Sequence, residues 1–340
     1  MKKILITGGA GFIAHHIIAH IIKNTDWEIV TLDRLDLSGN LNRLHEILDE
    51  FSIKDKKRLK IVFHDLKAEI NSQIKSELGS PDMILHLAAA SHVDRSIIYP
   101  MEFVLDNVVG TVNLLDFARS LKNLEKFVYF STDEIFGNAP EGVSYKEYDR
   151  YNSTNPYSAS KASAEEFCVA YENTYKLPII ITHTMNVFGE RQHPEKFIPM
   201  TIQRVRDSEK VFIHANKEKT KAGSRHYIHA QDVADGLMFI LGLKNYKHEG
   251  DFGNAKCPKF NLVGPEEINN LDLAQKIAEV QKRELIYELI DNHSSRPGHD
   301  LRYSLSPNLL KSLGWEPKIK LSKRIEEVVD WSLKNKRWLS

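Results

Sequence analysis

Short apolar runs rich in β-branched residues alternate with longer amphipathic stretches along the first half of the chain. These runs cover residues 4–7, 28–32, 59–63, 83–86, 127–130 and 179–182. Strands of a parallel sheet are buried on both faces and read as continuous apolar runs, and strands that alternate with helical stretches form βα units. The pattern therefore predicts an α/β fold with a doubly wound parallel sheet of the Rossmann type.

The pattern loosens after about residue 183, where seven prolines break the chain into short elements. We expect a Rossmann domain formed by residues 1–182 plus approximately 226–262. The remaining residues, 183–225 plus 263–340, are predicted to form a smaller, mixed C-terminal substrate lobe. Helical periodicity further predicts helices over residues 233–241 and 324–333.

The composition of the chain excludes several classes of protein. The 340 residues are 42% hydrophobic, and 46 Lys and Arg balance 46 Asp and Glu, so no overall basic field favours nucleic acid or an anionic membrane. Cys168 and Cys257 lack metal-ligand spacing, which favours a reducing compartment and no bound metal. No apolar run approaches the roughly 18 residues of a membrane span. We expect a cytoplasmic protein with neither a membrane nor a nucleic-acid partner.

A glycine-rich segment, Gly8-Gly-Ala-Gly11, follows the first predicted strand and precedes an apolar helical pattern. Glycines at this place permit a tight turn and let a pyrophosphate approach the helix N-terminus. Asp33 ends the second predicted strand 22 residues after Gly11, where a carboxylate accepts hydrogen bonds from an adenosine ribose and repels a 2′-phosphate. The segment predicts NAD as the cofactor in preference to NADP, although Arg34 weakens that preference slightly.

Two further segments follow the third and fourth predicted strands. Asp65 and Leu66 are placed to meet adenine. The small residues 87–90 leave room for a ring or a ribose, and close packing of a helix on a strand explains them equally well. The candidate cofactor-binding residues are Gly8, Gly11, Phe12, Ile13, Asp33, Asp65, Leu66, Ala88, Tyr157 and Lys161.

A Tyr and a Lys, Tyr157 and Lys161, stand four apart at the start of a predicted helix, which places them on one helix face. An ammonium beside a phenol lowers the phenol pKa from about 10, so Tyr157 is a candidate base for a sugar hydroxyl. Thr132 ends a predicted strand, at the edge where open α/β sheets bind ligands.

Asp133 and Glu134 follow Thr132 directly. Two further carboxylates are more than hydride transfer requires, since that reaction needs only one acid/base group. Adjacent carboxylates in a partly dry crevice ionise unequally, so one can act as an acid and the other as a base. Successive strand residues point to opposite faces, so both carboxylates reach one substrate only if the strand ends at Thr132.

Several motifs together carry a resemblance that runs nearly end to end. They lie at residues 7–13, 89–96, 107–111, 131–134, 157–161, 186, 194–196, 296–300 and 302–303. The chain resembles the extended short-chain dehydrogenase/reductase family and, within it, the nucleotide-sugar 4,6-dehydratases, especially those acting on dTDP-glucose. Epimerases of the same superfamily normally carry small residues in place of Asp133 and Glu134.

The resemblance implies a tightly bound NAD that is regenerated in each turnover. It implies oxidation at C4 with Tyr157 as the base, removal of the C5 proton by Glu134, protonation of the departing C6 hydroxyl by Asp133, and hydride return to C6. The product is a 4-keto-6-deoxy sugar nucleotide. The resemblance also implies a homodimer through helices near residues 110–121 and 157–173.

The nucleotide-sugar substrate carries a diphosphate, for which Arg side chains suit bidentate hydrogen bonding. The candidate substrate-binding residues are Ser91, His92, Asn186, Lys196, Arg225, Arg296 and His299. Ala90, His229 and residues 190–193 depart from the dTDP-glucose enzymes, so the nucleotide base (dTDP, UDP, GDP or CDP) and the hexose (glucose or N-acetylglucosamine type) stay open.

Two alternatives remain beside the dehydratase. The first is a sugar-nucleotide 4-epimerase or decarboxylase of the same family, which Asp133 and Glu134 disfavour. The second is a non-catalytic NAD(H)-sensing protein, which the intact Thr132, Tyr157 and Lys161 disfavour.

Overall fold

The computed structural model of the chain describes residues 1–36, 38–244, 246, 248–249, 255–291 and 300–340. These residues form two compact units, which we describe separately. The first unit comprises residues 1–135, 155–183 and 237–260, and the second comprises residues 136–154, 184–236 and 261–340.

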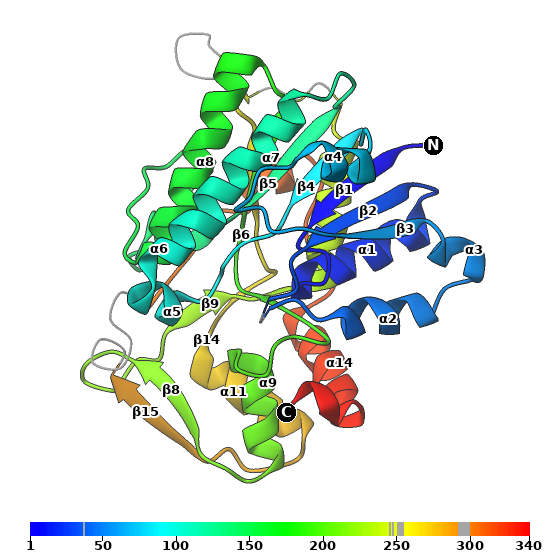
Figure 1. Cartoon of the computed structure of the whole chain (residues 1–340). Coiled ribbons are helices and arrows are strands. Elements are labelled where there is room, and N and C mark those ends of the chain that lie inside the picture. The colour runs from blue at the N-terminus through cyan, green and yellow to red at the C-terminus, as the bar shows by residue number, and fades with distance from the viewer. Residues whose placement is uncertain (37, 245, 247, 250–254, 292–299) are drawn as a thin grey trace. The chain divides into compact units, whose positions relative to one another are not determined.

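A seven-stranded sheet in the order β13-β6-β5-β4-β1-β2-β3 organises the first unit (Figure 1). Its strands are β1 (Lys3–Thr7), β2 (Glu28–Asp33), β3 (Leu59–Phe63), β4 (Met83–His86), β5 (Lys126–Thr132), β6 (Ile179–Thr184) and β13 (Lys259–Leu262). Strands β3, β2, β1, β4 and β5 run parallel to one another. This order confirms the predicted Rossmann fold, in which the chain winds outward in both directions from β1.

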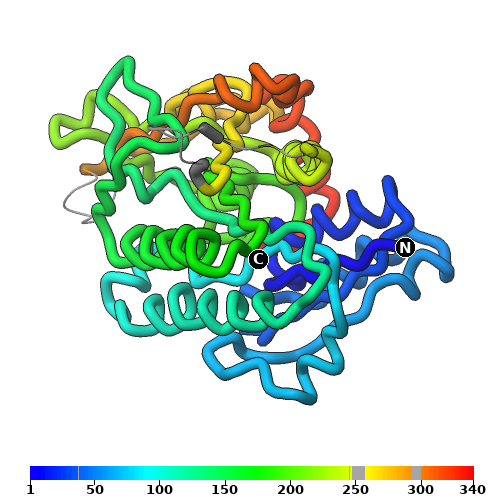
Figure 2. Tube along the Cα trace, turned by 90° about the horizontal axis from the view of Figure 1, so that it is seen from above, coloured from blue at the N-terminus to red at the C-terminus, as the bar shows by residue number. Residues whose placement is uncertain are grey.

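Helices follow the strands of this unit in sequence. They are α1 (Phe12–Asn24), α2 (Leu41–Asp49), α3 (Ile53–Lys56), α4 (Ser72–Leu78), α5 (Val93–Ile98), α6 (Pro100–Phe103), the π-helix η1 (Val104–Val109), α7 (Gly110–Arg119), the 3-10 helix η2 (Asp133–Phe136) and α8 (Pro156–Tyr175). Helices α7 and α8 lie side by side (Figure 2). Leu114 of α7 and Ala164 of α8 belong to one buried core with Leu5, Val30 and Phe127 of the sheet.

Helix α8 begins with strong local signals. The Asn155 side chain accepts a hydrogen bond from the Ser158 backbone, and the Ser158 side chain closes a capping box on the Asn155 backbone. Pro156 occupies the first turn, where its missing N–H costs nothing. The sequence therefore fixes the start of the helix that carries Tyr157 and Lys161.

The second unit is mixed. It contains α9 (Phe197–Arg206), α11 (Asn270–Val280), α13 (Asn308–Ser312), α14 (Leu321–Lys334), η4 (Lys336–Trp338) and the strands β7 (Val187–Phe188), β8 (Val211–Ala215), β9 (Ser224–His226), β10 (Ile228–His229), β14 (Glu267–Asn269) and β15 (Tyr287–Asp291). Strands β8 and β15 pair in parallel, whereas β9 and β14 pair antiparallel. Ile202, Ile277 and Val329 from α9, α11 and α14 share its core.

The two units differ from the expected domains mainly because residues 136–154 and 226–236 belong to the second unit, and the boundaries at residues 183 and 261–262 are shifted by one or two residues. Local pairing explains the first difference: Tyr145 forms a β-bridge with Leu305, and the Ala139 backbone donates to the Arg302 carbonyl. Helix α10 (Ala230–Gly242) crosses the division between residues 236 and 237, and the short strands β11 (His248–Glu249) and β12 (Ala255–Lys256) pair within the first unit.

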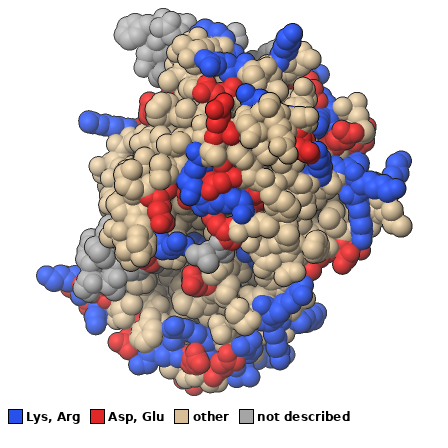
Figure 3. All heavy atoms as spheres, viewed as in Figure 1, with Lys and Arg blue, Asp and Glu red and all other residues tan. Residues whose placement is uncertain are grey.

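Acidic and basic side chains intermix over the face shown in Figure 3, as the equal numbers of the two charges suggest. Among the helices of the described residues, none combines the length and apolarity required to cross a bilayer.

Candidate active site

The glycine-rich segment forms a tight turn between β1 and α1. Gly8 adopts φ +72°, and a Cβ there would lie 3.0 Å from the Ala88 backbone. Gly11 occupies the N-cap of α1 and its N–H donates to the Gly8 carbonyl over 2.8 Å. Because these residues lack side chains, a ligand can approach the N-terminal N–H groups of α1, which is the environment that a pyrophosphate requires.

A pocket opens at this turn, entirely within the first unit. It is lined by Gly8, Gly11, Leu32, Asp33, Arg34, Asp36, Ser38, Gly39, His64, Asp65, Leu66, residues 87–90 and Asp106. Asp33 is oriented by two backbone hydrogen bonds, from Ala10 N to Oδ2 (3.0 Å) and from Leu35 N to Oδ1 (2.7 Å). These bonds place an ordered carboxylate in the pocket wall, as ribose recognition requires.

Six of the predicted cofactor residues line this pocket, namely Gly8, Gly11, Asp33, Asp65, Leu66 and Ala88. Phe12 and Ile13 form the first turn of α1 and are not among the residues that line it. Sequence reasoning did not assign Asp36, His64 or Asp106 to the pocket. The nearness of Asp36 to Asp33 and of His64 to Asp65 in the sequence could have signalled these two residues, whereas no such signal exists for Asp106.

A buried hydrogen-bond chain runs beneath the pocket. Thr7 Oγ1 lies 2.8 Å from His86 Nδ1, and His86 Nε2 lies 2.9 Å from Thr111 Oγ1. Burial, with the Lys161 charge adding to it, lowers the pKa of His86 to about 3, so the ring is neutral. Thr111 donates its hydroxyl proton to the Asn107 carbonyl and must accept from Nε2–H, which assigns Nδ1 as the acceptor from Thr7.

The chain continues from Asn107 in η1 to the catalytic helix. The Asn107 side chain accepts from Ala90 N (2.8 Å) and donates to both Ala90 O (3.0 Å) and Ser160 Oγ (2.8 Å). Ser160 in turn donates to the Tyr157 carbonyl over 2.7 Å. These bonds join a wall of the cofactor pocket to the helix turn that carries Tyr157. They therefore fix the positions of the two parts of the site relative to each other.

The two carboxylates lie where the chain leaves the sheet. Strand β5 ends at Thr132 and the 3-10 helix η2 begins at Asp133, so the alternation of strand faces stops before the acidic pair. Thr132 donates to Asp133 Oδ1 (3.0 Å) and accepts from Glu134 N (3.4 Å). Asn155 Nδ2 donates to Glu134 Oε2 over 3.3 Å. The requirement that the strand end at Thr132 is met.

Tyr157 is buried beside these groups, and its ring meets Phe103 edge-on with centroids 6.3 Å apart. Burial raises the pKa of the Tyr157 phenol well above its ordinary value, and the negative charges of Glu134 and Asp133 add to this effect. A hydrogen bond with the Thr132 side chain opposes the rise in pKa. The structure therefore contradicts the expected lowering of the phenol pKa.

Lys161 explains that reversal, because its ammonium is directed to the sheet. Nζ donates to the Phe130 carbonyl over 2.6 Å and lies 4.3 Å from the centroid of the Tyr129 ring. Burial lowers the pKa of Lys161 to about 8, and the negative charge of Glu165 partly opposes that shift. Lys161 therefore changes between its ammonium and neutral amine forms close to physiological pH.

A second buried cluster lies one helical turn further along α8. Glu165 Oε1 lies 2.8 Å from Lys259 Nζ, and His183 Nε2 lies 3.1 and 3.2 Å from the two Glu165 oxygens. Although burial opposes it, the interactions with His183 and Lys259 hold the pKa of Glu165 far below its ordinary value. Glu165 is therefore a fixed negative charge near Lys161.

The predicted substrate-binding residues are distributed over both units. Ser91 and His92 precede α5 in the first unit, while Asn186, Lys196 and Arg225 belong to the second. The Arg225 guanidinium donates to the carbonyls of Ser224, Leu301 and Asp300 and lies 4.5 Å from the centroid of the Tyr303 ring. Arg296 and His299 lie outside the described residues.

His229, a departure noted in the sequence, is fully buried in the second unit. Its Nδ1 accepts from Gln231 N (3.2 Å), its Nε2 lies 3.3 Å from Glu190 Oε2, and its ring meets Phe188 edge-on. Two of the unusual positions, His229 and Glu190, are therefore one interacting pair.

The parallel sheet, the glycine turn and the Tyr157–Lys161 pair define a dehydrogenase/reductase of the short-chain type. Comparison with known proteins narrows this class. The sequence matches the family described as GDP-mannose 4,6 dehydratase over residues 5–328. The chain belongs to this family.

Individual relatives cover nearly the whole chain. A dTDP-glucose 4,6-dehydratase of Salmonella typhimurium is 34% identical over 363 residues, covering 99% of this chain and 94% of the relative. The structure of a Bacillus anthracis dTDP-glucose 4,6-dehydratase in complex with NAD is 27% identical, has a TM-score of 0.83 and covers 99% of this chain and 98% of that one. A Thermus thermophilus UDP-glucose 4-epimerase in complex with NAD is also 27% identical, with a TM-score of 0.82 and 97% and 98% coverage.

Proposed function

We propose that the protein is an NAD-dependent nucleotide-sugar 4,6-dehydratase, a hydro-lyase that converts an NDP-hexose into an NDP-4-keto-6-deoxyhexose and water. The observation that carries this function is the placement of Asp133 and Glu134 in a turn after β5, beside the buried Tyr157. The dehydratase and the epimerase neighbours share the fold to a similar degree, so the fold alone does not separate the two reactions. The second carboxylate separates the two reactions, because hydride transfer alone needs only one acid/base group.

The pocket at the glycine turn fits NAD. The N-terminus of α1 offers N–H groups to the pyrophosphate, Asp33 offers a carboxylate to the adenosine ribose, and Asp65 and Leu66 offer a wall to adenine. Tyr157 and Lys161 are assigned to the nicotinamide ribose. When bound, NAD supplies an acceptor for hydride and, once reduced, a hydride donor.

The residues of the chain carry the proton transfers. Tyr157 removes the proton from the C4 hydroxyl, with the Thr132 hydroxyl orienting the same oxygen. The resulting C4 ketone acidifies the C5 proton, which Glu134 removes. Asp133 donates a proton to the departing C6 hydroxyl, so that water leaves and a C5–C6 double bond forms. With the cofactor bound, hydride would be returned to C6 and a proton to C5, so that the cofactor would be unchanged overall.

A panel of nucleotide sugars tests this function. The purified protein is incubated with dTDP-, UDP-, GDP- and CDP-linked glucose and with UDP-N-acetylglucosamine, and the products are analysed by mass spectrometry. We expect one substrate class to lose the mass of one water without net consumption of NAD. Inversion at C4 with retention of the C6 hydroxyl would identify an epimerase. An unchanged panel after prolonged incubation would favour the non-catalytic NAD(H)-binding protein.

We assign binding of the diphosphate to Arg225 and Arg296, with Asn186 and Lys196 assisting, and contacts to the sugar to Ser91, His92 and His299. The ordered guanidinium of Arg225 supports its assignment, because three backbone carbonyls already fix its plane. A fixed guanidinium loses little side-chain entropy when it binds a phosphate.

The homodimer is also proposed. Large hydrophobic side chains are exposed on α5, η1 and α8, among them Ile98, Leu105 and Phe167, and α8 contacts both α5 and η1. An apolar surface of this kind is typical of a subunit interface. Light scattering tests the assembly, and Phe167→Glu is expected to shift the protein toward monomer. We further propose that the enzyme works in the cytoplasm, which its two separated free cysteines support.

The pH dependence of turnover is expected to report Lys161. The ammonium form predominates below its pKa of about 8, and we expect kcat to fall as the pH rises above this value. Because the negative charge of Glu165 stabilises the ammonium, Glu165→Gln is expected to move this limb to lower pH.

Glu165→Asp retains the charge and should leave the limb in place, and Glu166→Gln removes an exposed charge from the same helix as a second control. Circular dichroism checks the folding of each variant. A limb that does not move in a folded Glu165→Gln protein contradicts the assignment.

A further inference from the structure

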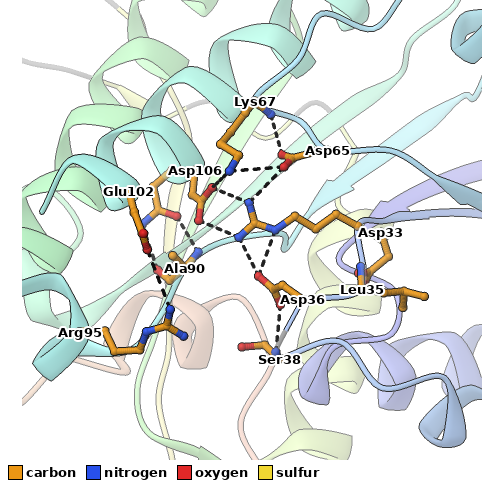
Figure 4. A network of polar contacts seen from close by, with 12 residues as sticks. Asp33, Leu35, Asp36, Ser38, Asp65, Lys67, Ala90, Arg95, Glu102 and Asp106 are labelled. Atoms are coloured by element: carbon orange, nitrogen blue, oxygen red, sulfur yellow. Dashed lines mark hydrogen bonds and ion pairs between the residues drawn. The ribbon is translucent and has the colours of Figure 1, made fainter. Parts of the chain in front are cut away.

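Five charged side chains gather at the adenosine end of the cofactor pocket. Asp36, Asp65, Lys67 and Asp106 point toward a common centre in Figure 4. The Arg34 guanidinium contacts the three carboxylates of this group. They come from the segment after β2, the segment after β3, and the π-helix η1. Arg34, Asp36, Asp65 and Asp106 all line the pocket.

The guanidinium is clasped from two sides. Its Nε and one terminal nitrogen donate to Asp36 Oδ2 over 3.0 and 2.6 Å. Its two terminal nitrogens donate to the two oxygens of Asp106 over 2.5 and 2.7 Å, a bidentate pair. Asp65 adds a third carboxylate at 3.5 Å. Arg34 is therefore paired with three carboxylates in the wall of the pocket that we assign to the adenosine.

The carboxylates that clasp Arg34 are themselves held in place. Asp36 Oδ1 accepts from Ser38 N over 2.9 Å, and the Asp106 side chain is only 10% exposed. Although burial opposes it, the hydrogen bond from Arg34 lowers the pKa of Asp36. Asp36 therefore keeps its negative charge at neutral pH.

The balance of charge at this end of the pocket is negative. Four carboxylates, those of Asp33, Asp36, Asp65 and Asp106, stand against the three cations Arg34, Lys67 and Arg43. A phosphate monoester brings roughly −1.5 to −2 further charges at neutral pH. An arginine directly after the ribose-binding acid is well placed to receive a 2′-phosphate. In this protein the positive charge of Arg34 is already balanced by carboxylates, and its N–H groups already donate to them.

We propose that Asp36 and Asp106 are specificity-determining residues that withhold Arg34 from a 2′-phosphate and thereby restrict the pocket to dinucleotides without one. Asp33 supplies the hydrogen bonds to the ribose. Asp36 and Asp106, which we call the clamp, decide whether Arg34 acts as a phosphate ligand. Once both clamp carboxylates are neutralised, Arg34 becomes that ligand. The proposal rests on the proposed function only in taking NAD as the cofactor.

The test measures binding, not turnover. The protein is freed of bound nucleotide, and calorimetry gives dissociation constants for NAD and NADP and for the fragments 5′-AMP and 2′,5′-ADP. In the double variant Asp36→Asn/Asp106→Asn we expect affinity for NADP and 2′,5′-ADP to rise about 10- to 100-fold, the range of one charge-assisted interaction. Affinity for 5′-AMP should change little.

Two controls isolate the clamp. Asp49→Asn/Asp116→Asn removes the same charge from exposed positions outside the pocket and should not improve NADP binding. Adding Arg34→Ala to the clamp variant should abolish the gain.

The outcomes that overturn the proposal are specific. A folded clamp variant with unchanged NADP affinity would contradict the proposal. A gain in NADP affinity that persists after Arg34→Ala would also contradict it. If the double variant fails to fold, the single variants Asp36→Asn and Asp106→Asn must each show a smaller gain in NADP affinity. Failure of the unaltered protein to bind NAD at all would instead overturn the cofactor assignment, so the two failures are distinguishable.

Discussion

Tyr157→Phe is expected to lower kcat by about 10²- to 10⁴-fold, the usual contribution of a positioned acid/base group. The substitution removes only the phenolic oxygen. The contact of the ring with Phe103 and the hydrogen bond from the Tyr157 backbone to Ser96 Oγ (3.1 Å) do not involve that oxygen. The variant should therefore fold normally and bind both cofactor and substrate.

The loss should arise because the C4 hydroxyl no longer has a base. Burial raises the phenol pKa, and the hydrogen bond with the Thr132 side chain opposes that rise. We expect the variant to show neither product nor reduced nicotinamide in single-turnover experiments, since the block precedes hydride transfer.

Tyr171→Phe is the matched control for this prediction. It removes a hydroxyl from the same helix, one that donates to Asp116 over 3.0 Å away from the catalytic groups. Its kcat should stay close to that of the unaltered protein. Turnover by Tyr157→Phe at a rate near that of this control would show that another group takes the C4 proton.

The fold was predictable because its signals are local. Six of the seven strands of the large sheet carry their own apolar run, and their bounds differ from the predicted ones by at most two residues, as for residues 179–182 and β6 (Ile179–Thr184). The seventh, β13 (Lys259–Leu262), carries no such run and was not predicted as a separate strand. The start of α8 was equally readable, since Asn155, Pro156 and Ser158 act within one helical turn. Such signals survive in a single sequence because they do not depend on distant contacts.

The electrostatics of the site were not predictable in this way. The spacing of Tyr157 and Lys161 places them on one face, but the direction of the Lys161 amine depends on the Phe130 carbonyl, 31 positions away. Asp106 joins the cofactor pocket because a π-helix brings it to Arg34, across 72 positions. The neutral His86 likewise gains its role from Thr7 and Thr111 on other elements. Contacts between distant segments leave no periodic trace in the sequence.

Substitutions in the acidic pair are expected to separate oxidation from elimination. Asp133→Asn removes the acid that protonates the departing C6 hydroxyl, and we expect product formation to fall by about 10²- to 10⁴-fold. The step at C4 needs Tyr157 and not Asp133, so oxidation should continue. Reduced nicotinamide should therefore accumulate on the enzyme after substrate is added, and its absorbance gives the measurement.

Glu134→Gln is expected to block the same pathway one step earlier. In deuterated water the unaltered enzyme should introduce deuterium at C5, because the proton removed there is replaced from solvent. The Glu134→Gln variant should oxidise C4 while leaving the C5 hydrogen in place, whereas Asp133→Asn should still permit exchange at C5. Mass spectrometry of the recovered sugar distinguishes these results.

The two variants thus test the division of labour as well as the reaction. Asp149→Asn removes an exposed carboxylate and should leave both signals unchanged. If Asp133→Asn abolishes exchange at C5 and Glu134→Gln retains it, the roles are reversed. If both variants retain full elimination, the pair has no part in the chemistry. The hydrogen bond from Thr132 to Asp133 and that from Asn155 to Glu134 give each carboxylate a different partner, and this asymmetry is the structural basis for expecting two separate roles.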